Sequence, residues 1–443
     1  MKQYFVLACC LGLISSVAFG AENTLDPLDN WHQWRGPLAT GVAPKGNPPI
    51  QWNEKTNIKW KVAIPGLGNA SPIIWGDQVF VLTAIDSGRM ADPKDIPKPD
   101  PTFKVRTQPP QTYHQFVVLS IDRQTGKIQW QQVATEQVPH EGRQPTHTYA
   151  GASPMTDGHY LYVSFGSRGI FCYDLKGNLQ WKADLGLMHT RLGWGEGISP
   201  VVHGDTLLMN WDQEAGAFIA ALDAKTGKIK WKKDRDEVTS WATPLIVPLN
   251  GRVQAIVSAT KKVRSYDLAT GEVIWECGGQ TTNVIPSPVA NDKFVICMSG
   301  YQGAMACAIP LDAANDLTGT NQLLWKYDKG TPYVPSPLLI RDRLYFTQGN
   351  NALLTCLDTN TGKPVMDRER LPGLSGIYAS PVAAAGRIYL TGRDGTVLVI
   401  KQSDRLEILA TNRLPDPIDA SPAIVGKQIL LRGKEYLYCL EEK

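Results

Sequence analysis

The residues best suited to chemistry are polar and aromatic side chains that mostly come just before a recurring Ser/Thr-Pro dipeptide. They combine indole and phenol rings with amide, carboxylate and imidazole groups. Such a mixture around a shared depression would bind a polar small molecule or a peptide, unless these residues are only loop residues that pack together. The set comprises Asn69, His147, Tyr149, Trp194, Glu196, Trp241, Asn283, Tyr333, Tyr378 and Asp419.

Glu196 is the strongest candidate for a carboxylate that faces a ligand, because it lies between two glycines and next to Trp194. Asp212 and the charged run 235–237 are weaker candidates, since a run of charges usually lies on a solvated loop. The candidate set holds a single histidine, and no Cys/His spacing is typical of zinc, so a zinc site has little support.

The sequence lacks the motifs that are typical of nucleophilic catalysis and of nucleotide binding. The chain has no nucleophile elbow, Walker loop or dinucleotide fingerprint at a strand-to-helix junction. Its 45 basic and 42 acidic residues are mixed along the 443 positions without a charged stripe. This pattern argues against nucleic acid and anionic lipid as partners.

The elements that must position these residues belong to a repeat. A Ser/Thr-Pro dipeptide followed by an apolar run returns with a period of about 44 residues. Each copy is typical of a short strand, a tight turn and an alternating strand, as in SPLLIRDRLYFTQG. The dipeptides begin at Ser71, Ser153, Ser199, Thr243, Ser287, Ser336, Ser380 and Ser421.

A second phrase closes the repeat, as in IDRQTGKIQW, LDAKTGKIKW and YDLATGEVIW. The aspartate can cap the turn through its side chain, and the glycine supplies the positive φ that the turn needs. A tryptophan at one place in successive repeats is better explained by packing between neighbours than by separate ligand contacts. These tryptophans are Trp60, Trp130, Trp181, Trp231, Trp275 and Trp325.

Four short antiparallel strands repeated eight times predict an all-β, eight-bladed β-propeller. The last repeat ends after three strands, so we expect the N-terminal strand 57–65 to complete the eighth blade and close the ring. The predicted units are a signal peptide (1–20), an N-terminal extension (21–56) and the propeller (57–443). An insertion (87–113) separates the second and third strands of the first blade, where it could form a partial lid. Strand alternation places this insertion and the candidate residues on one face, at the mouth of the channel.

Export is predicted by the first 20 residues. Lys2 is followed by an apolar run over 5–19 and a small residue, Gly20, at the cleavage position. We therefore expect a periplasmic or secreted monomer without a transmembrane segment, with lipid anchoring at Cys9 as the alternative. Cys172, Cys356 and Cys439 occupy equivalent segments and are expected to be buried, unpaired thiols. Only Cys297 and Cys307 are predicted to come close enough to pair.

The phrase Asp-x-x-Thr-Gly-Lys-x-x-Trp, within eight all-β units, resembles the PQQ-like (quinoprotein-type) β-propeller repeat family over nearly the whole mature chain. The strings SWATPL, YVPSPLL, YASPV, DASPAI and WHQWRGP are most similar to its exported bacterial PQQ-binding-like members. The resemblance implies an eight-bladed propeller. It does not imply one function, because one branch comprises PQQ- and calcium-dependent alcohol dehydrogenases. Another is the non-catalytic propeller lipoprotein of the outer-membrane barrel assembly machinery.

The chain departs from the dehydrogenase branch, whose quinone lies against a vicinal cysteine pair. The only adjacent pair here, Cys9-Cys10, falls in the predicted signal peptide. We therefore expect a non-catalytic propeller without a cofactor that binds a protein or small ligand over its central channel. The alternative is a PQQ- and calcium-dependent oxidoreductase, with Glu196, Asn283 and Asp419 as calcium ligands and Trp241 stacked on the quinone. A hydrolase or lyase on the same face also stays open.

Overall fold

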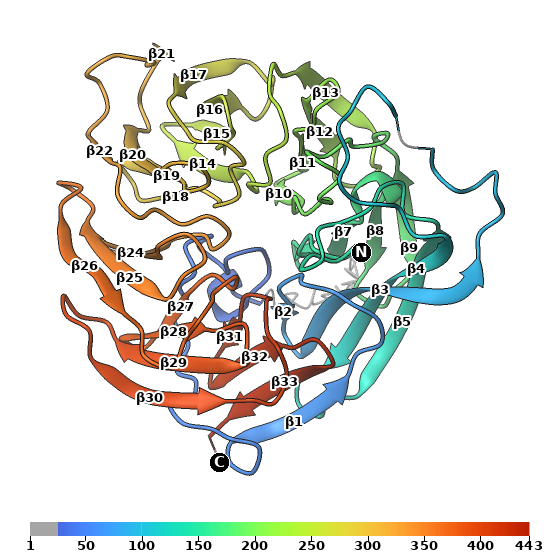
Figure 1. The fold of residues 1–443 in the computed structure, drawn as a ribbon, viewed down its shortest axis with the longest axis horizontal. Coiled ribbons are helices and arrows are strands. Elements are labelled where there is room, and N and C mark those ends of the chain that lie inside the picture. Colours follow the sequence, from blue (N-terminus) through green and yellow to red (C-terminus); the bar gives the residue numbers. More distant parts are fainter. Residues whose placement is uncertain (1–24, 99, 443) are drawn as a thin grey trace, which may run out of the picture.

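The computed structural model describes residues 25–98 and 100–442. The predicted signal peptide, with Cys9 and Cys10, lies outside the described residues. The described strands form eight sheets around a central axis, each with four antiparallel strands, and one sheet carries an additional short strand (Figure 1). This arrangement confirms the predicted eight-bladed all-β propeller.

Each blade is numbered in chain order, and its strands run from the channel outward. Blade 1 contains β2 (Ile73–Trp75), β3 (Gln78–Met90), β4 (Thr112–Asp122) and β5 (Ile128–Gln137), and blade 2 contains β6 (Met155–Thr156), β7 (Tyr160–Ser164), β8 (Ile170–Asp174) and β9 (Leu179–Ala183). Blade 3 contains β10 (Val201–His203), β11 (Thr206–Trp211), β12 (Phe218–Asp223) and β13 (Ile229–Asp234). Blade 4 contains β14 (Leu245–Leu249), β15 (Arg252–Val257), β16 (Lys262–Asp267) and β17 (Val273–Gly278), with β21 (Asn315–Asp316) parallel to β17.

Blades 5 to 8 follow the same pattern. Blade 5 contains β18 (Val289–Ala290), β19 (Phe294–Ser299), β20 (Met305–Pro310) and β22 (Trp325–Tyr327), and blade 6 contains β23 (Leu338–Ile340), β24 (Arg343–Thr347), β25 (Leu353–Asp358) and β26 (Pro364–Arg370). Blade 7 contains β27 (Val382–Ala384), β28 (Arg387–Thr391), β29 (Thr396–Lys401) and β30 (Ile408–Arg413). Blade 8 contains β31 (Ala423–Val425), β32 (Gln428–Arg432), β33 (Tyr436–Glu441) and β1 (Ile58–Ala63). Two short 3-10 helices, η1 (Pro27–Asp29) and η2 (Gly166–Arg168), accompany the strands.

Burial along the strands explains why their sequences differ. The third strand β29 is buried at all but its last residue, because neighbouring blades cover both of its faces. The outer strand β13 instead has only exposed and half-buried residues, as expected for a strand at the rim. The apolar core is therefore divided into layers between blades.

The N-terminal strand closes the ring. β1 pairs antiparallel with β33 and places Trp60 opposite Cys439. The eighth sheet thus joins the two ends of the chain, as predicted. Closure removes the free edge that β33 would otherwise present to other chains.

Most of the recurring tryptophans connect each blade to the next. The indole N–H donates to the carbonyl that follows the turn aspartate, and the ring lies against the turn glycine of that next blade. The N–H···O pairs are Trp60 with Arg123 (2.8 Å), Trp130 with Leu175 (3.1 Å), Trp181 with Ala224 (2.9 Å), Trp231 with Leu268 (2.9 Å) and Trp325 with Thr359 (2.6 Å).

Trp275 departs from this pattern because blade 5 lacks the Asp-x-x-Thr-Gly turn. Its ring is buried among apolar residues of blades 4 and 5, and its N–H has no hydrogen-bond partner among the described residues. The Trp275 indole therefore packs in the core between blades 4 and 5 but does not donate to a carbonyl of the described residues.

The serine or threonine of each Ser/Thr-Pro dipeptide takes part in a ring around the channel, the hydroxyl ring. From Ser71 through Ser380, each backbone N–H donates to the hydroxyl of the corresponding residue in the next blade, over 2.9 to 3.3 Å. The Ser71 hydroxyl closes the ring by donating to the carbonyl of Ser421 at 2.5 Å. These bonds link all eight blades at the hub.

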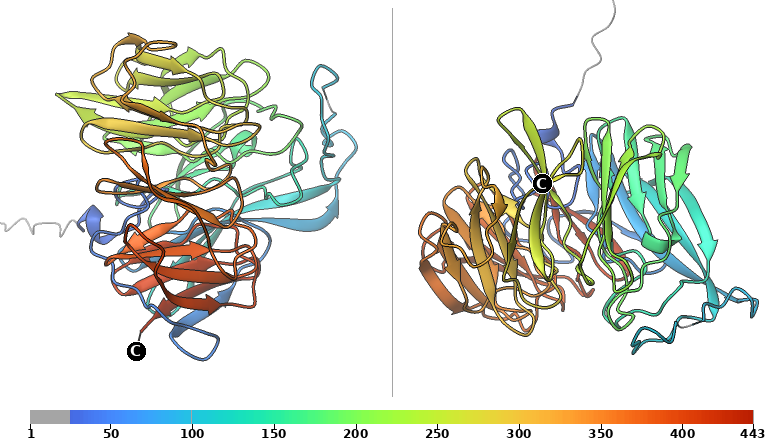
Figure 2. Two further views of the ribbon diagram at one scale, coloured as in Figure 1. Left: turned by 60° about the vertical axis from the view of Figure 1, so that its left-hand side comes forward. Right: turned by 90° about the horizontal axis from the view of Figure 1, so that it is seen from above.

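The N-terminal segment 30–47 crosses one end of the channel and forms a plug there. It pairs with the innermost strands of blades 1 and 7 through the bridges Trp31↔Ile74 and Val42↔Ala383. The Arg35 side chain is 2% exposed and donates to the carbonyls of Pro337 and Pro381, both at 2.7 Å. Figure 2 shows this segment, in blue, on the face opposite the loop between β3 and β4.

The six cysteines of the described residues are all buried and unpaired. Cys172, Cys356 and Cys439 lie in the third strands of their blades, as predicted from their equivalent segments. Cys297 and Cys307 are directly opposite each other on β19 and β20 and are present as free thiols. Within the described part of the chain, no helix has the length and apolar character needed to cross a membrane.

Candidate functional site

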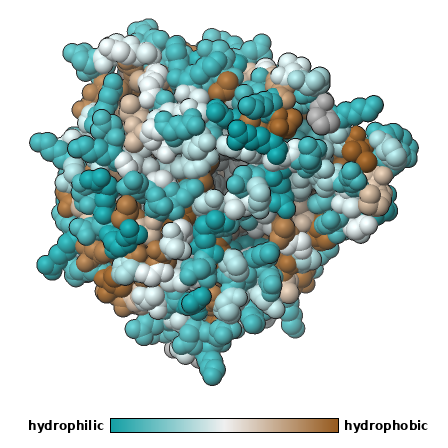
Figure 3. Space-filling model, viewed as in Figure 1, coloured by the Kyte–Doolittle hydropathy of each residue, from teal (hydrophilic) through white to brown (hydrophobic). Residues whose placement is uncertain are grey.

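A funnel of about 370 Å³ opens at the centre of the face opposite the plug, where Figure 3 shows the surface hollowed. Its walls come from loops of all eight blades, and the plug contributes Trp34. The candidate residues brought together here are Asn69, His147, Trp194, Trp241, Tyr333, Tyr378 and Asp419.

The funnel also contains residues that the sequence patterns did not single out. Tyr301 lies on the link between the second and third strands of blade 5, a position that strand alternation already assigns to this face. Gln144 and Thr146 precede the Ser/Thr-Pro dipeptide of blade 2. Trp34 had no local signal, because only the folded plug brings it to the channel. Its N–H donates to the hydroxyl of Ser287 at 3.0 Å.

The aromatic wall of the funnel is fixed by its own contacts. Tyr301 and Tyr333 stack with ring centroids 4.7 Å apart, and Trp194 meets Tyr301 edge-on at 6.4 Å. The N–H of Trp241 donates to the carbonyl of Gly195 at 2.7 Å. These rings are all half-buried, so part of each surface faces the funnel without further rearrangement.

The funnel has no net charge. The Asp419 carboxylate accepts two hydrogen bonds from Arg393, at 2.7 and 3.0 Å, and this guanidinium lies 3.9 Å above the ring of Tyr378. The His147 Nε2–H donates to the carbonyl of Glu196 at 2.7 Å, and burial lowers the pKa of this imidazole. At neutral pH the histidine is uncharged and the aspartate is paired.

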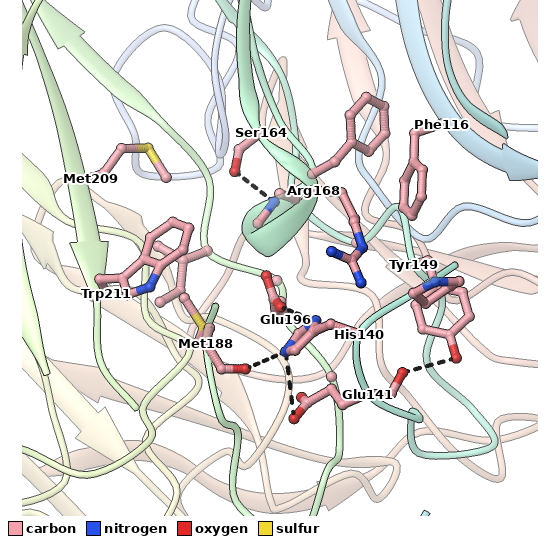
Figure 4. Close-up of a pocket in the computed structure, with 18 of the residues that line it drawn as sticks. Phe116, His140, Glu141, Tyr149, Ser164, Arg168, Met188, Glu196, Met209 and Trp211 are labelled. Carbon is pink, nitrogen blue, oxygen red and sulfur yellow. Dashed lines mark hydrogen bonds and ion pairs between the residues drawn. The ribbon is translucent and has the colours of Figure 1, made fainter. Parts of the chain in front are cut away.

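Tyr149 and Glu196 lie instead in a smaller side pocket of about 40 Å³ between blades 2 and 3 (Figure 4). The Glu196 carboxyl accepts from the backbone N–H and the hydroxyl of Ser167, at 2.7 and 2.6 Å. Gly151 and Gly197 line both this pocket and the funnel. Glu196 therefore faces a buried cluster rather than the funnel itself.

Two glutamates and a histidine of the side pocket have strongly displaced pKa values. Burial raises the pKa of Glu141 to about 8, with the nearby Glu196 adding to the effect, and burial raises that of Glu196 to about 7. Burial lowers the pKa of His140 to about 4. His140 Nε2–H donates to the Met188 carbonyl at 2.6 Å, so its unprotonated Nδ1 faces Glu196 Oε1 at 3.4 Å. A protonated Glu196 fits this arrangement, because it can donate to Nδ1.

Asn283 lines neither pocket. Its side chain is buried, and neither its amide oxygen nor its nitrogen has a partner among the described residues. Its backbone has a positive φ of 58°, which asparagine adopts more readily than most residues. The structure therefore indicates that Asn283 serves the local left-handed backbone conformation and not either pocket.

The expectation that the charged run 235–237 lies on a solvated loop was wrong for two of its members. The side chains of Arg235 and Asp212 are fully buried and form an ion pair at 2.7 Å. Glu237 is also buried and accepts from Arg264 at 3.0 Å. The charges compensate one another inside the blade 3–blade 4 interface, which sequence order alone did not reveal.

The residues considered for calcium and PQQ do not fit that group. Glu196 is held by Ser167, Asp419 is paired with Arg393, and Asn283 is buried outside the funnel. Throughout residues 25–98 and 100–442, no group of three or more His, Cys, Asp or Glu residues is placed to hold a metal ion. The residues that line the funnel also include no lysine or arginine to meet the carboxylates of PQQ.

Several known proteins share this architecture. The BamB from Moraxella catarrhalis superimposes with a TM-score of 0.53 at 13% identity, covering 82% of this chain and 100% of that one. A europium-containing methanol dehydrogenase gives 0.63 at 10% identity, with coverage of 94% and 99%. The quinohemoprotein alcohol dehydrogenase from Comamonas testosteroni gives 0.58 at 10% identity, with coverage of 94% and 81%. Identities this low show the fold alone.

Sequence comparison identifies the family. A curated relative, outer membrane protein assembly factor BamB from Francisella salina, is 29% identical over 105 residues. That alignment covers 24% of this chain and only 18% of the relative's length. The family described as outer membrane protein assembly factor BamB matches residues 114–368, more than half of the chain. The chain therefore belongs to this family of PQQ-like β-propeller repeat proteins.

Proposed function

We propose that this chain is an exported, non-catalytic propeller that binds a ligand in the funnel over its central channel. The observation that carries the proposal is the funnel itself, whose half-buried aromatic walls are held by internal contacts. Fixed walls lower the entropic cost of binding, because few side chains must become ordered when a ligand enters. The plug supports this function by closing the other end of the channel and supplying Trp34 to the site.

Within the funnel, a binding role is favoured over a catalytic role by the state of its carboxyl and imidazole groups, those of Asp419 and His147. Asp419 is engaged by Arg393, and His147 is neutral and already donates to a backbone carbonyl. General acid–base catalysis needs a group that is free to exchange a proton with the substrate. The volume of about 370 Å³ lies at the lower end of typical small-molecule sites and favours a small ligand over a protein partner.

The test is native mass spectrometry of the protein purified from a bacterial periplasm. We expect a bound small molecule that is lost in Tyr333→Ala, because this change removes one ring of the stacked pair. The matched control is Phe103→Ala, which removes an aromatic ring from the insertion, where Phe103 stacks on His189 at 4.8 Å. A ligand retained by folded Tyr333→Ala, or lost equally from the control, would contradict the proposal.

The oxidoreductase alternative predicts a different result. Adding PQQ and calcium to the purified protein would then raise its melting temperature and support dye reduction with alcohols or sugars. We expect neither change, since the oxygen ligands considered for calcium are not brought together. Dye reduction that depends on both additions would restore this alternative.

A further inference from the structure

We propose that the ligand of the funnel is a neutral saccharide. This inference rests on the proposed function and specifies the chemical class that the funnel accepts. It is supported by the charge state of the walls, their aromatic surface and the hydroxyl ring below them.

The charge state of the funnel argues against ionic ligands. Its lining includes no lysine or arginine, and its one carboxylate is neutralised by two hydrogen bonds from Arg393. An anion would meet the Asp419 carboxylate without a free cation, and a cation would compete with Arg393 for that carboxylate. A desolvated ligand charge without a partner is strongly unfavourable, so the site favours a neutral molecule.

The aromatic surface fits a molecule with apolar C–H faces. Trp194, Trp241 and Tyr378 line the funnel together with the stacked pair Tyr301 and Tyr333. An aromatic face carries partial negative charge and attracts C–H groups that are polarised by neighbouring oxygens. The faces of a pyranose ring present such C–H groups, whereas its edges present hydroxyls.

The polar groups of the funnel match those hydroxyls. All members of the hydroxyl ring except Ser71 line the funnel, and the hydroxyls of Ser153 through Ser421 each accept one backbone N–H. The hydroxyl of Ser287 accepts the indole N–H of Trp34 as well. A hydroxyl that accepts one bond keeps its proton and a second lone pair for another partner. The amide nitrogen of Asn69 donates to the carbonyl of Thr146 at 3.1 Å, while its amide oxygen accepts no hydrogen bond from any residue that the structure describes. These groups both donate and accept, as a polyhydroxylated ligand requires.

Asp419 supplies a positioned acceptor at the same site. Arg393 fixes the plane of the carboxylate through two bonds, and the carboxylate side chain remains 18% exposed. Each carboxylate oxygen can accept more than one hydrogen bond. A planar carboxylate held in this way is suited to accept from two adjacent hydroxyls of one sugar ring.

The experiment applies the purified full chain to an array of neutral glycans and their uronic acid counterparts. The best ligand is then measured by isothermal titration calorimetry. We expect binding to a neutral glycan that is at least tenfold tighter than to its uronic acid analogue. Tyr333→Ala and Asp419→Asn should each weaken binding at least tenfold. Tyr333→Phe should retain most of it because the ring remains, and Phe103→Ala should leave it unchanged.

Other outcomes separate the two proposals. If no glycan binds but another small molecule or a peptide binds and depends on Tyr333, the saccharide inference is wrong and the funnel remains a binding site. A preference for the uronic acid, or glycan binding unaffected by both Tyr333→Ala and Asp419→Asn, also overturns the inference. If nothing binds in a manner that depends on Tyr333, both proposals fail. Near-ultraviolet circular dichroism checks that each variant is folded.

Discussion

The contact between each turn glycine and the recurring tryptophan of the neighbouring blade explains why the turn phrase requires glycine at this position. Gly227 has a φ of +70°, and a Cβ at this position would lie 2.5 Å from the ring of Trp181. Two effects therefore exclude a side chain, namely the left-handed backbone and the indole of the neighbouring blade. Gly386 has a nearly identical φ of +72°, but no atom lies within 4 Å of the Cβ position.

Substitutions at these two glycines separate the cost of the left-handed backbone from the cost of the contact with the indole. We expect Gly386→Ala to lower the free energy of unfolding by about 1 kcal/mol, the cost of a left-handed alanine. Gly227→Ala should lower it by about 3 kcal/mol, because overpacking against Trp181 adds to that cost. Urea denaturation of both variants measures the difference. Equal losses would show that the indole contact contributes nothing to the strictness of the turn.

The side pocket gives the molecule a defined dependence on pH. The folded-state pKa values of Glu141 and Glu196 lie above the ordinary value of 4.5, so their contribution to stability falls as pH rises from about 4.5 to 8. The folded-state pKa of His140 lies below 6.5, so its contribution rises with pH between about 4 and 6.5. Of these three groups, only the two glutamates still change the stability between pH 6.5 and about pH 8.

Glu196→Gln tests this assignment. The uncharged amide can still bond to Ser167 and donate to His140 Nδ1, and it has no charge to desolvate. We expect the stability of the variant relative to the native protein to increase by about 1.4 kcal/mol between pH 6 and pH 8.5. Thermal unfolding at both pH values measures it, with Glu369→Gln at an exposed position as the control. A difference that does not change with pH would contradict a protonated Glu196.

At the scale of elements, the plug depends on one buried arginine. Arg35 bonds to the carbonyls of two blades, and burial lowers its pKa to about 9, so it remains protonated at neutral pH. No carboxylate among the described residues forms an ion pair with it. The guanidinium instead donates to the carbonyl oxygens of Pro337, Pro381 and Thr40.

Replacing Arg35 should loosen the plug. We expect Arg35→Met to lower the free energy of unfolding by about 3 kcal/mol, because buried carbonyls lose hydrogen bonds to a charged donor. Lys45→Met, an exposed change in the same segment, should alter it by less than about 0.5 kcal/mol. Urea denaturation measures both. A small effect of Arg35→Met would show that the plug is held mainly by its backbone bridges.

At the scale of the whole molecule, the propeller is closed by strand pairing, by the hydroxyl ring and by tryptophan contacts between blades. A variant that begins at residue 57 lacks the plug but keeps β1, and a variant that begins at residue 64 lacks both. We expect the first to stay monomeric with a lower melting temperature. The second should associate through the exposed edge of β33, as light scattering would detect. A monomeric second variant would show that β1 is not needed to protect this edge.

Much of the fold was determined by the sequence itself, because the period of the repeat, the turn phrase and strand alternation are local properties. The eight blades, the closing strand β1 and the equivalent cysteines were predicted from these patterns. The same patterns assigned most of the funnel residues to one face, since loops at equivalent positions of a closed ring must converge.

The tertiary structure alone decided how side chains on that face are partnered. Trp34 reaches the funnel through a plug that has no repeat signal, and the Arg235–Asp212 pair is buried although its charges predicted a solvated loop. Glu196 turns into the side pocket because Ser167 of the neighbouring loop supplies two donors. These outcomes depend on contacts between segments that are distant in the sequence. The spacing of residues along the chain does not determine which of these contacts a side chain makes.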